Sequence, residues 1–384
     1  MLNRLRDRAA ALAPSASAGE SRAAASTAPI YLIAMAGYPN YGDELIVARW
    51  LKFFARHLPN TDVWLDVREP GNASSIFKGM HPRLHVTNTV FRTLFEHQHL
   101  GKQHPAEAVR NLGTPLFDLG LLDLREAGTI HLVGGGFINA EWPEQKALVD
   151  MMRAVREVSG AKLVATGQGL MPFVGETFVD FDHVSVRDTP SADALGITRG
   201  FDDAYLDQHP ATPAESAPGK DALEVFVCVQ NDAVDDGAHE AMVDFARRQL
   251  QQWDIPRERV RYVEAIPGND HAGYAALQDL IAEDGFIPFT RFWRSDFAYA
   301  PHQLWLTSRF HHHLMASLHG ARGVALSGKA GYYDVKHGSI IESGSNWKLF
   351  TGSEAPVHLA DLQVPADFAP VVEAKNKEAA EIYL

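Results

Sequence analysis

Cysteine is almost absent from this chain of 384 residues, in which only Cys228 occurs. One thiol cannot form a disulfide within the chain, which is typical of proteins in a reducing compartment. Because Cys228 stands in the apolar stretch 225–229, we expect a buried strand residue rather than a reactive thiol. The cysteine content therefore excludes a disulfide scaffold and favours a cytoplasmic location.

The chain also has few basic residues and no long apolar segment, and both features exclude certain partners. No apolar segment is long enough to span a bilayer, so we do not expect an integral membrane protein. Basic residues are outnumbered, with 35 Lys and Arg against 48 Asp and Glu, and the formal net charge is −13. Such a chain repels phosphates at long range, which disfavours nucleic acid as a principal partner. An anionic substrate would have to be bound by a few local cations.

The rest of the chain alternates apolar, strand-like segments with amphipathic, helix-like segments. This pattern predicts an α/β protein with parallel sheets covered on both faces. The alternation covers residues 29–210, stops in a segment rich in Pro, Ala and Ser at 211–221, and restarts over 222–370. We therefore predict two Rossmann-like domains joined by a linker around a cleft. Residues 1–28 are expected to form a flexible tail, and residues 371–384 a closing helix.

A cluster of polar residues, Asn40-Tyr41-Gly42-Asp43-Glu44, separates the first predicted strand from the first predicted helix. Asn40 and Gly42 suit a turn or a close backbone approach, and Asp43 can cap the helix. Asp43 can equally lie at the edge of the cleft, where its carboxylate would accept a proton from a substrate hydroxyl. Both roles of Asp43 remain open at this stage.

Three later strands also end in residues suited to ligands. Gly134, Gly135 and Gly136 directly follow an apolar strand, and the backbone amides of such a loop can hold an anion. Gln168 and Arg187 end the next two strands, at the edge where open α/β sheets bind their ligands. The glycines do not follow the GxGxxG spacing, so a nicotinamide cofactor is not expected.

The segment 308–311 places a cation beside an imidazole. In an extended segment Arg309 and His311 share a face, so we expect the following helix to begin at about His312. Both side chains would then meet at the positive end of that helix, a natural anion site. Adjacent histidines do not converge readily on one ion, and a metal site is not predicted.

At these motifs the chain resembles the polysaccharide pyruvyl transferase family. The matching segments, in order, are NYGDE at 40–44, GGG at 134–136, GQGLMP at 167–172, SVRD with Ser191 at 185–191, Asp203-Ala204, and SRFH at 308–311 leading to Gly320. The resemblance implies a GT-B-like fold and no cofactor. It also implies transfer of the enolpyruvyl-derived group of phosphoenolpyruvate onto a sugar of a polysaccharide or glycan precursor, lipid-linked precursors included, to form a pyruvate ketal.

The resemblance further implies roles for individual residues. Arg187 and Arg309, one from each domain, would bind the carboxylate and phosphate of the donor. His311 would be the general acid, because imidazole can carry a proton near neutral pH, and Asp43 would be the base. The family often has a lysine in the region that Lys329 and Lys336 occupy; Lys329 is a candidate substrate contact, and the choice between the two lysines stays open. The remaining expected substrate contacts are Asn40, Gly42, Glu44, Gly134, Gly135, Gly136 and Gln168.

Two other functions fit parts of the sequence. The segment 263–270 in the second half also suits a nucleotide-sugar glycosyltransferase of the same two-domain shape. A non-catalytic protein that binds sugars or anions is the second alternative. Four aromatic residues could stack on an acceptor sugar or belong to the core: Trp142, Phe292, Trp293 and Trp305.

Overall fold

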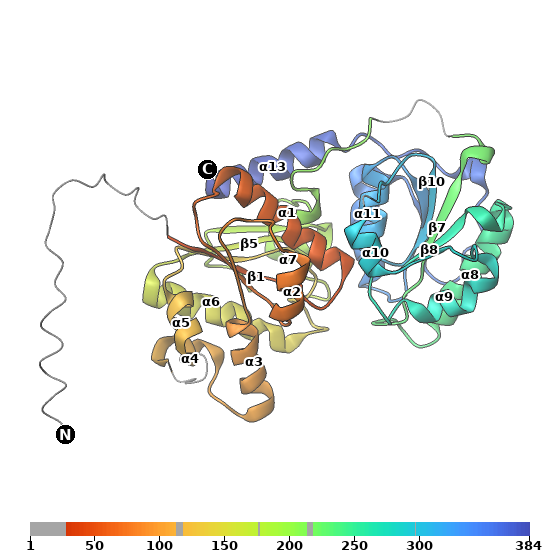
Figure 1. Ribbon diagram of the computed structural model, residues 1–384. Helices are drawn as coiled ribbons and strands as arrows, with labels where there is room; N and C mark the ends of the chain where they lie inside the picture. Colours follow the sequence, from red (N-terminus) through yellow and green to blue (C-terminus); the bar gives the residue numbers. More distant parts are fainter. Residues whose placement is uncertain (1–27, 113–117, 176, 213–217, 296) are drawn as a thin grey trace, which may run out of the picture.

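The computed structural model describes residues 28–112, 118–175, 177–212, 218–295 and 297–384, which form two parallel sheets of six strands each (Figure 1). The predicted tail 1–28 lies outside the described residues except for Ala28, as do residues 213–217 of the predicted linker. No helix of the described part is long and apolar enough to cross a membrane.

The first sheet has the strand order β3-β2-β1-β4-β5-β6. Its strands are β1 Ile30–Ile33, β2 Val63–Asp66, β3 Leu84–Thr87, β4 Thr129–Leu132, β5 Lys162–Gln168 and β6 His183–Val186. The helices of this half are α1 Tyr41–His57, α2 Pro70–Ile76, α3 Thr89–Leu100, α4 Pro105–Asn111, α5 Asp118–Arg125, α6 Lys146–Ser159 and α7 Thr189–Leu195.

The second sheet has the order β12-β11-β10-β7-β8-β9, which repeats the order of the first sheet when its strands are numbered from β7. Its strands are β7 Glu224–Cys228, β8 Val260–Val263, β9 Phe286–Ile287, β10 Gln303–Thr307, β11 Arg322–Leu326 and β12 Lys348–Phe350. The helices are α8 Ala238–Trp253, α9 His271–Leu277, α10 Phe289–Arg294, α11 Phe310–Leu318 and α12 Tyr333–Ile340. Each sheet therefore has the Rossmann order, with a switch point beside its first strand, at β1/β4 and at β7/β10.

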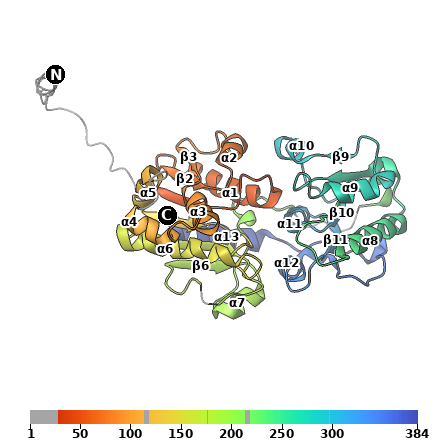
Figure 2. The ribbon, with the colours of Figure 1, turned by 90° about the horizontal axis from the view of Figure 1, so that it is seen from below.

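The two halves share one hydrophobic core. One cluster of buried side chains includes β1 and α1 in the first half and Trp305, Phe310 and Leu314 in the second. Helices α1 and α11 lie between the sheets (Figure 2), and the rings of Tyr41 and His312 stack there at a centroid distance of 4.8 Å. Apolar burial stabilises this contact, so α1 and α11 are held together at the bottom of the cleft.

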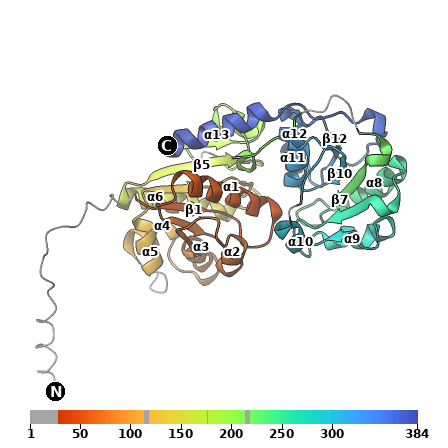
Figure 3. The ribbon, with the colours of Figure 1, turned by 45° about the horizontal axis from the view of Figure 1, so that its top comes forward.

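The closing helix, α13 Ala369–Tyr383, returns from the second half to the first and lies against it (Figure 3). The hydroxyl of Tyr383 lies 2.8 Å from Nδ1 of His131, and Lys162 Nζ donates to the carbonyl of Ile382 at 3.0 Å. Lys375 is completely buried and forms an ion pair with Asp203. The last helix thus ties the second half back onto the first sheet.

Three local differences from the sequence prediction affect the site. Strand β10 was not predicted, although it is fully buried between β7 and β11. Helix α12, in the segment that separates β11 from β12, was not predicted either. Helix α11 begins at Phe310 and not at about His312, so Arg309 stands at its N-cap and His311 in its first turn.

Candidate functional site

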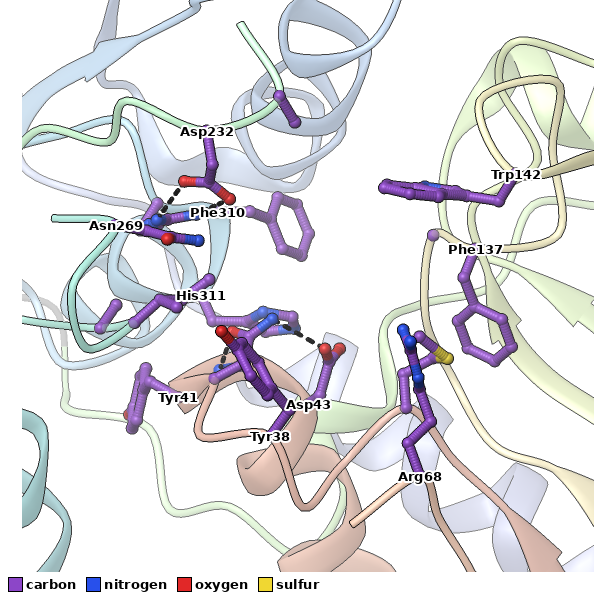
Figure 4. Close-up of a pocket in the computed structure, with 18 of the residues that line it drawn as sticks. Tyr38, Tyr41, Asp43, Arg68, Phe137, Trp142, Asp232, Asn269, Phe310 and His311 are labelled. Carbon is purple, nitrogen blue, oxygen red and sulfur yellow. Dashed lines mark hydrogen bonds and ion pairs between the residues drawn. The ribbon is translucent and has the colours of Figure 1, made fainter. Parts of the chain in front are cut away.

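A cavity of about 690 Å³ lies between the two sheets. It takes residues from the loops after β1 and β4 and from those after β7 and β10, which are the two switch points. Ligands of open α/β sheets bind at such points. Figure 4 shows Trp142, Phe137 and Arg68 along one side of the cavity, and Asp232, Asn269 and Phe310 along the other.

The loop at 40–43 forms the floor of the cavity. Asn40 is the N-cap of α1, with Oδ1 accepting from the amide of Gly42 at 3.2 Å, so the predicted capping role of Asp43 is wrong. Asn40 Nδ2 also donates to Asp43 Oδ2 at 2.7 Å, which orients the carboxylate. Burial raises the pKa of Asp43 above its ordinary value, against the lowering effect of His311 and Lys336. Asp43 therefore lies in the cavity as a carboxylate able to exchange a proton.

Gly42 allows the two domains to touch at the site. A Cβ added to Gly42 would lie 1.9 Å from Nδ1 of His311, so the imidazole rests directly on the Gly42 backbone. The amide of Tyr41 donates to the carbonyl of Ala265 in the second domain at 3.0 Å. Only glycine leaves room for His311 at this position.

Glu44 does not line the cavity. Its side chain is fully buried, and Oε1 accepts from the amide of Gly37 at 2.9 Å. Burial raises the pKa of Glu44 to about 8. Glu44 thus shapes the loop at 37–44 from behind, and this arrangement offers it no contact with a ligand.

The three glycines after β4 have separate roles. A Cβ on Gly134 would lie 3.0 Å from Asp203 Oδ2, and one on Gly135 would lie 2.4 Å from the ring of Phe137. Gly136 alone of the three lines the cavity, and there a Cβ would meet Arg187 Nη2 at 3.0 Å. The first two glycines therefore accommodate protein side chains, and Gly136 leaves space for a cation.

Gln168 is also placed behind the site and not in it. Its side chain is fully buried, and Nε2 donates to the carbonyls of Leu132, Val133 and Thr166 at 2.9 to 3.1 Å. These contacts hold the end of β4, from which the glycine loop departs. Gln168 is therefore a structural support for the loop.

Arg187 and His311 meet at one buried carboxylate that the sequence analysis missed. Asp202 Oδ2 accepts from Arg187 Nη1 at 2.7 Å, and Asp202 Oδ1 lies 3.3 Å from His311 Nε2. Burial alone would raise the pKa of Asp202, but His311 and Arg187 hold it below its ordinary value. The guanidinium of Arg187 also lies over the ring of Phe310, 4.6 Å from its centre. Asp202 was missed because it precedes the more conspicuous Asp203-Ala204 pair.

Arg309 is neutralised by its own domain. Its Nη2 lies 2.6 Å from Oδ1 of Asp232 and 2.6 Å from Oδ1 of Asp270. Arg309 lines the same cavity as Arg187, and both are buried. Arg309 and His311 nevertheless point to different partners, since Arg309 turns to the second domain and His311 to Asp202 of the first.

The two candidate lysines lie in different places. Lys329 Nζ forms an ion pair with Glu141 Oε2 at 2.6 Å and does not line the cavity. Lys336 on α12 does line the cavity, with Nζ 3.5 Å from the ring centre of Tyr332. Burial, and then the nearby Arg187, lower the pKa of Lys336 well below its ordinary value. Lys336 therefore replaces Lys329 as the candidate substrate contact, while Lys329 bridges the two domains.

The aromatic candidates divide sharply between core and cavity. Phe292 and Trp305 are buried in the core, and Trp293 packs against it. Trp142 is 43% exposed and lines the cavity, as does Tyr38, which the sequence analysis did not single out. No group of three His, Cys, Asp or Glu residues in the described part of the chain is placed to hold a metal ion.

Most of the chain matches one known protein family. The profile of the family described as polysaccharide pyruvyl transferase matches residues 40–329, about three quarters of the chain. The chain belongs to the polysaccharide pyruvyl transferase family. This pyruvyl transferase is therefore a transferase enzyme. A search of curated proteins found no match.

Solved structures resemble this pyruvyl transferase over more than nine tenths of its length, at low identity. HepE of Anabaena with UDP and glucose is 12% identical, with a TM-score of 0.47, over 92% of this chain and 95% of the other. MnaA of S. aureus with UDP is 10% identical, with a TM-score of 0.48, over 93% and 88%. The spinosyn rhamnosyltransferase SpnG with thymidine diphosphate is 11% identical, with a TM-score of 0.37, over 92% and 91%. The likeness concerns the overall fold, in which two Rossmann-type sheets are arranged as in GT-B proteins.

Proposed function

We propose that this pyruvyl transferase uses phosphoenolpyruvate as donor and a sugar with two free hydroxyls as acceptor, and that it forms a pyruvate ketal. One observation carries the proposal: Arg187 of the first domain and Lys336 of the second face one cavity at Gly136, beside an imidazole paired with Asp202. Phosphoenolpyruvate carries a carboxylate and a phosphate on a small carbon frame. A pair of buried cations fits such a donor.

Donor binding would alter the charge balance of the cavity. Lys336 has no ion pair with any described residue, and Asp202 is the one ion-pair partner of Arg187 among those residues. An anion placed between them gains a charged hydrogen bond without breaking an ion pair of Lys336. Arg309, already bound to Asp232 and Asp270, would keep those carboxylates in place and contribute less to the donor.

The chemistry begins with a proton from His311. Protonation of the methylene carbon of the donor uses the π electrons of the C=C bond to form a methyl C–H bond and leaves an oxocarbenium-like centre at C2. A first sugar hydroxyl then attacks C2, forming a C–O bond, and its proton passes to Asp43. The carboxylate of Asp202, 3.3 Å from Nε2, would orient the imidazole of His311 for the transfer.

Ring closure completes the transfer. A second hydroxyl of the same sugar attacks C2, the C–O bond to phosphate breaks, and the phosphate leaves with the electron pair. Of the two hydroxyl protons released, one replaces the proton given to the methyl group and the other leaves on inorganic phosphate. The sum is phosphoenolpyruvate plus diol giving ketal plus phosphate, with no oxidant or cofactor needed.

The test combines donor binding with turnover. Phosphoenolpyruvate binding would be measured by calorimetry, and phosphate release with galactosyl, mannosyl and glucuronyl acceptors. Lys336→Met should weaken donor binding by about tenfold or more, whereas His311→Asn should retain binding and lower turnover by about a hundredfold. Arg294→Met, an exposed arginine outside the cavity, is the matched control.

A nucleotide-sugar glycosyltransferase makes the opposite prediction. The acidic residues of the segment 263–270 are engaged by their own backbone, since Asp270 Oδ2 accepts from the amides of Ala265 and Ile266, each at 2.8 Å. Thermal shift measurements with phosphoenolpyruvate and with nucleotide sugars separate the two functions. A rise in Tm with a nucleotide sugar and none with phosphoenolpyruvate would overturn the proposal.

A further inference from the structure

The cavity extends beyond the proposed donor site to a wall of different chemistry. This wall consists of Trp142 and Phe137 from the loop after β4 and Arg68 from the loop after β2 (Figure 4). None of the three is needed for the donor in the proposed reaction. An aromatic face beside a cation is a combination that binds a sugar ring carrying an acidic group.

Trp142 combines an exposed ring with a backbone held by hydrogen bonds. It is the most exposed tryptophan of the described chain, at 43%, yet its position is fixed on both sides. Its backbone amide donates to the carbonyl of Asn139 at 3.2 Å, and its carbonyl accepts from the amide of Gln145 at 3.0 Å. The neighbouring Glu141 is paired with Lys329 of the second domain at 2.6 Å. Exposure of a large ring that is held in this way points to a ligand and not to loose packing.

Arg68 supplies a cation that the protein leaves unbalanced. Its side chain is exposed at the cavity, and it forms no ion pair with any described residue. The other two arginines of the cavity, Arg187 and Arg309, are each paired with buried aspartates. Glu69 and Glu144 also line the cavity, but neither pairs with Arg68. Arg68 is therefore available to bind an anion in the cavity.

We propose that Trp142 and Arg68 form the acceptor subsite, in which a pyranose packs on the indole and an acidic substituent of the acceptor binds Arg68. This inference rests on the proposed function, because it assigns the acceptor of that same reaction. The acidic group is a carboxylate, as in a uronic acid, or a phosphate, as in a sugar phosphate. Either would bind the planar guanidinium through two parallel hydrogen bonds.

Equilibrium binding to the full chain tests the subsite without turnover. The probes are methyl glucuronide for the carboxylate, mannose 6-phosphate for the phosphate, and methyl mannoside as the neutral sugar. Wild type should bind at least one acidic probe about tenfold more tightly than the neutral one. Arg68→Met should remove this preference, and Arg68→Lys should keep part of it. Arg294→Met, also an exposed arginine, should leave it unchanged.

The indole is tested separately. Trp142→Ala should weaken all three sugars, whereas Trp142→Phe, which keeps an aromatic face, should retain most of the affinity. Tryptophan fluorescence should respond to the sugars in wild type, and this response should be lost in Trp142→Phe. Equal binding of acidic and neutral sugars, or no binding of either acidic probe, would overturn the subsite.

Measurements of donor affinity distinguish a failure of the acceptor subsite from a failure of the proposed function. Phosphoenolpyruvate affinity, measured in the same variants, should be unchanged by Arg68→Met and Trp142→Ala. A loss of phosphoenolpyruvate affinity in Arg68→Met would place Arg68 at the donor and overturn the subsite. Failure of phosphoenolpyruvate to bind wild type would overturn the proposed donor, and the sugar titrations would still decide on the subsite.

Discussion

His311 of the second domain and Asp202 of the first meet at the base of the cleft, with Nε2 3.3 Å from Oδ1. The other oxygen of the same carboxylate accepts from Arg187 at 2.7 Å. One buried side chain thus orients both the proposed general acid and a proposed donor cation. Because the contact joins the two domains, the reactive arrangement exists only when both are in place.

The first prediction concerns this shared carboxylate. Asp202→Asn keeps the size of the side chain but removes the negative charge beside the imidazole of His311 and the guanidinium of Arg187. We expect kcat to fall about a hundredfold and KM for phosphoenolpyruvate to rise much less, because Arg187 and Lys336 remain. Phosphate release measured over a range of donor concentrations separates the two constants. The control is Asp284→Asn, which changes an exposed aspartate and should match wild type. An unchanged kcat in Asp202→Asn would show that Asp202 has no role in the reaction.

The second prediction is a proton taken up when the donor binds. In the free protein burial lowers the pKa of Lys336 and favours the neutral amine, while a bound dianion favours the charged form. The pKa of Lys336 is then higher in the complex than in the free protein. Between these two values binding takes up a proton, so donor affinity falls as the pH rises through that interval.

Calorimetry in buffers of different ionisation enthalpy measures this uptake. The donor phosphate can also exchange protons, so the relevant quantity is the difference between wild type and Lys336→Met at the same pH. We expect wild type to take up more protons than the variant. Identical values in the two proteins would show that Lys336 is charged already, or that it does not contact the donor.

The third prediction uses the space between Gly42 and His311. In Gly42→Ala the new Cβ would lie 1.9 Å from Nδ1, so the imidazole must leave its present position. Turnover should drop about a hundredfold while donor binding to Lys336 and Arg187 largely persists. Gly71→Ala is the control, since its Cβ meets nothing within 4 Å. Wild-type turnover in Gly42→Ala would mean that the position of His311 is not critical.

The general plan of the fold could be predicted because it depends on local pattern. The apolar strand Ile30–Ile33, for example, is buried on both faces, and its composition alone reveals this. Strand β10 was overlooked because it directly precedes the conspicuous segment 308–311, and its central place in the sheet depends on pairing with strands distant in sequence.

The exact composition of the site could not be predicted in the same way. The rule that alternate residues share a face in an extended segment placed Arg309 and His311 together, but carboxylates from opposite domains draw them apart. Lys336 could not be separated from Lys329 because only the course of α12 brings it to Gly136. The neighbours of His311 show the same dependence, since His312 and His313 are both fully buried packing residues.

The last prediction concerns the ion pair that fastens α13 to the first domain. Lys375 is fully buried between Asp203 and Glu378, and Asp203 also accepts from the amide of Gly134 and from Trp50 Nε1, each at 2.8 Å. Lys375→Met would leave the buried carboxylate of Asp203 without its cation, which costs about 3–5 kcal/mol in buried pairs, whereas Glu378 keeps its contact with His183 at 2.8 Å. Urea unfolding should show this loss in the free energy of unfolding.

The control is Lys377→Met on the exposed face of the same helix, which should change the free energy of unfolding by less than about 0.5 kcal/mol. Equal stabilities of the two variants would mean that apolar packing alone holds α13, and that Asp203 keeps the Gly134 loop in place without help from the helix.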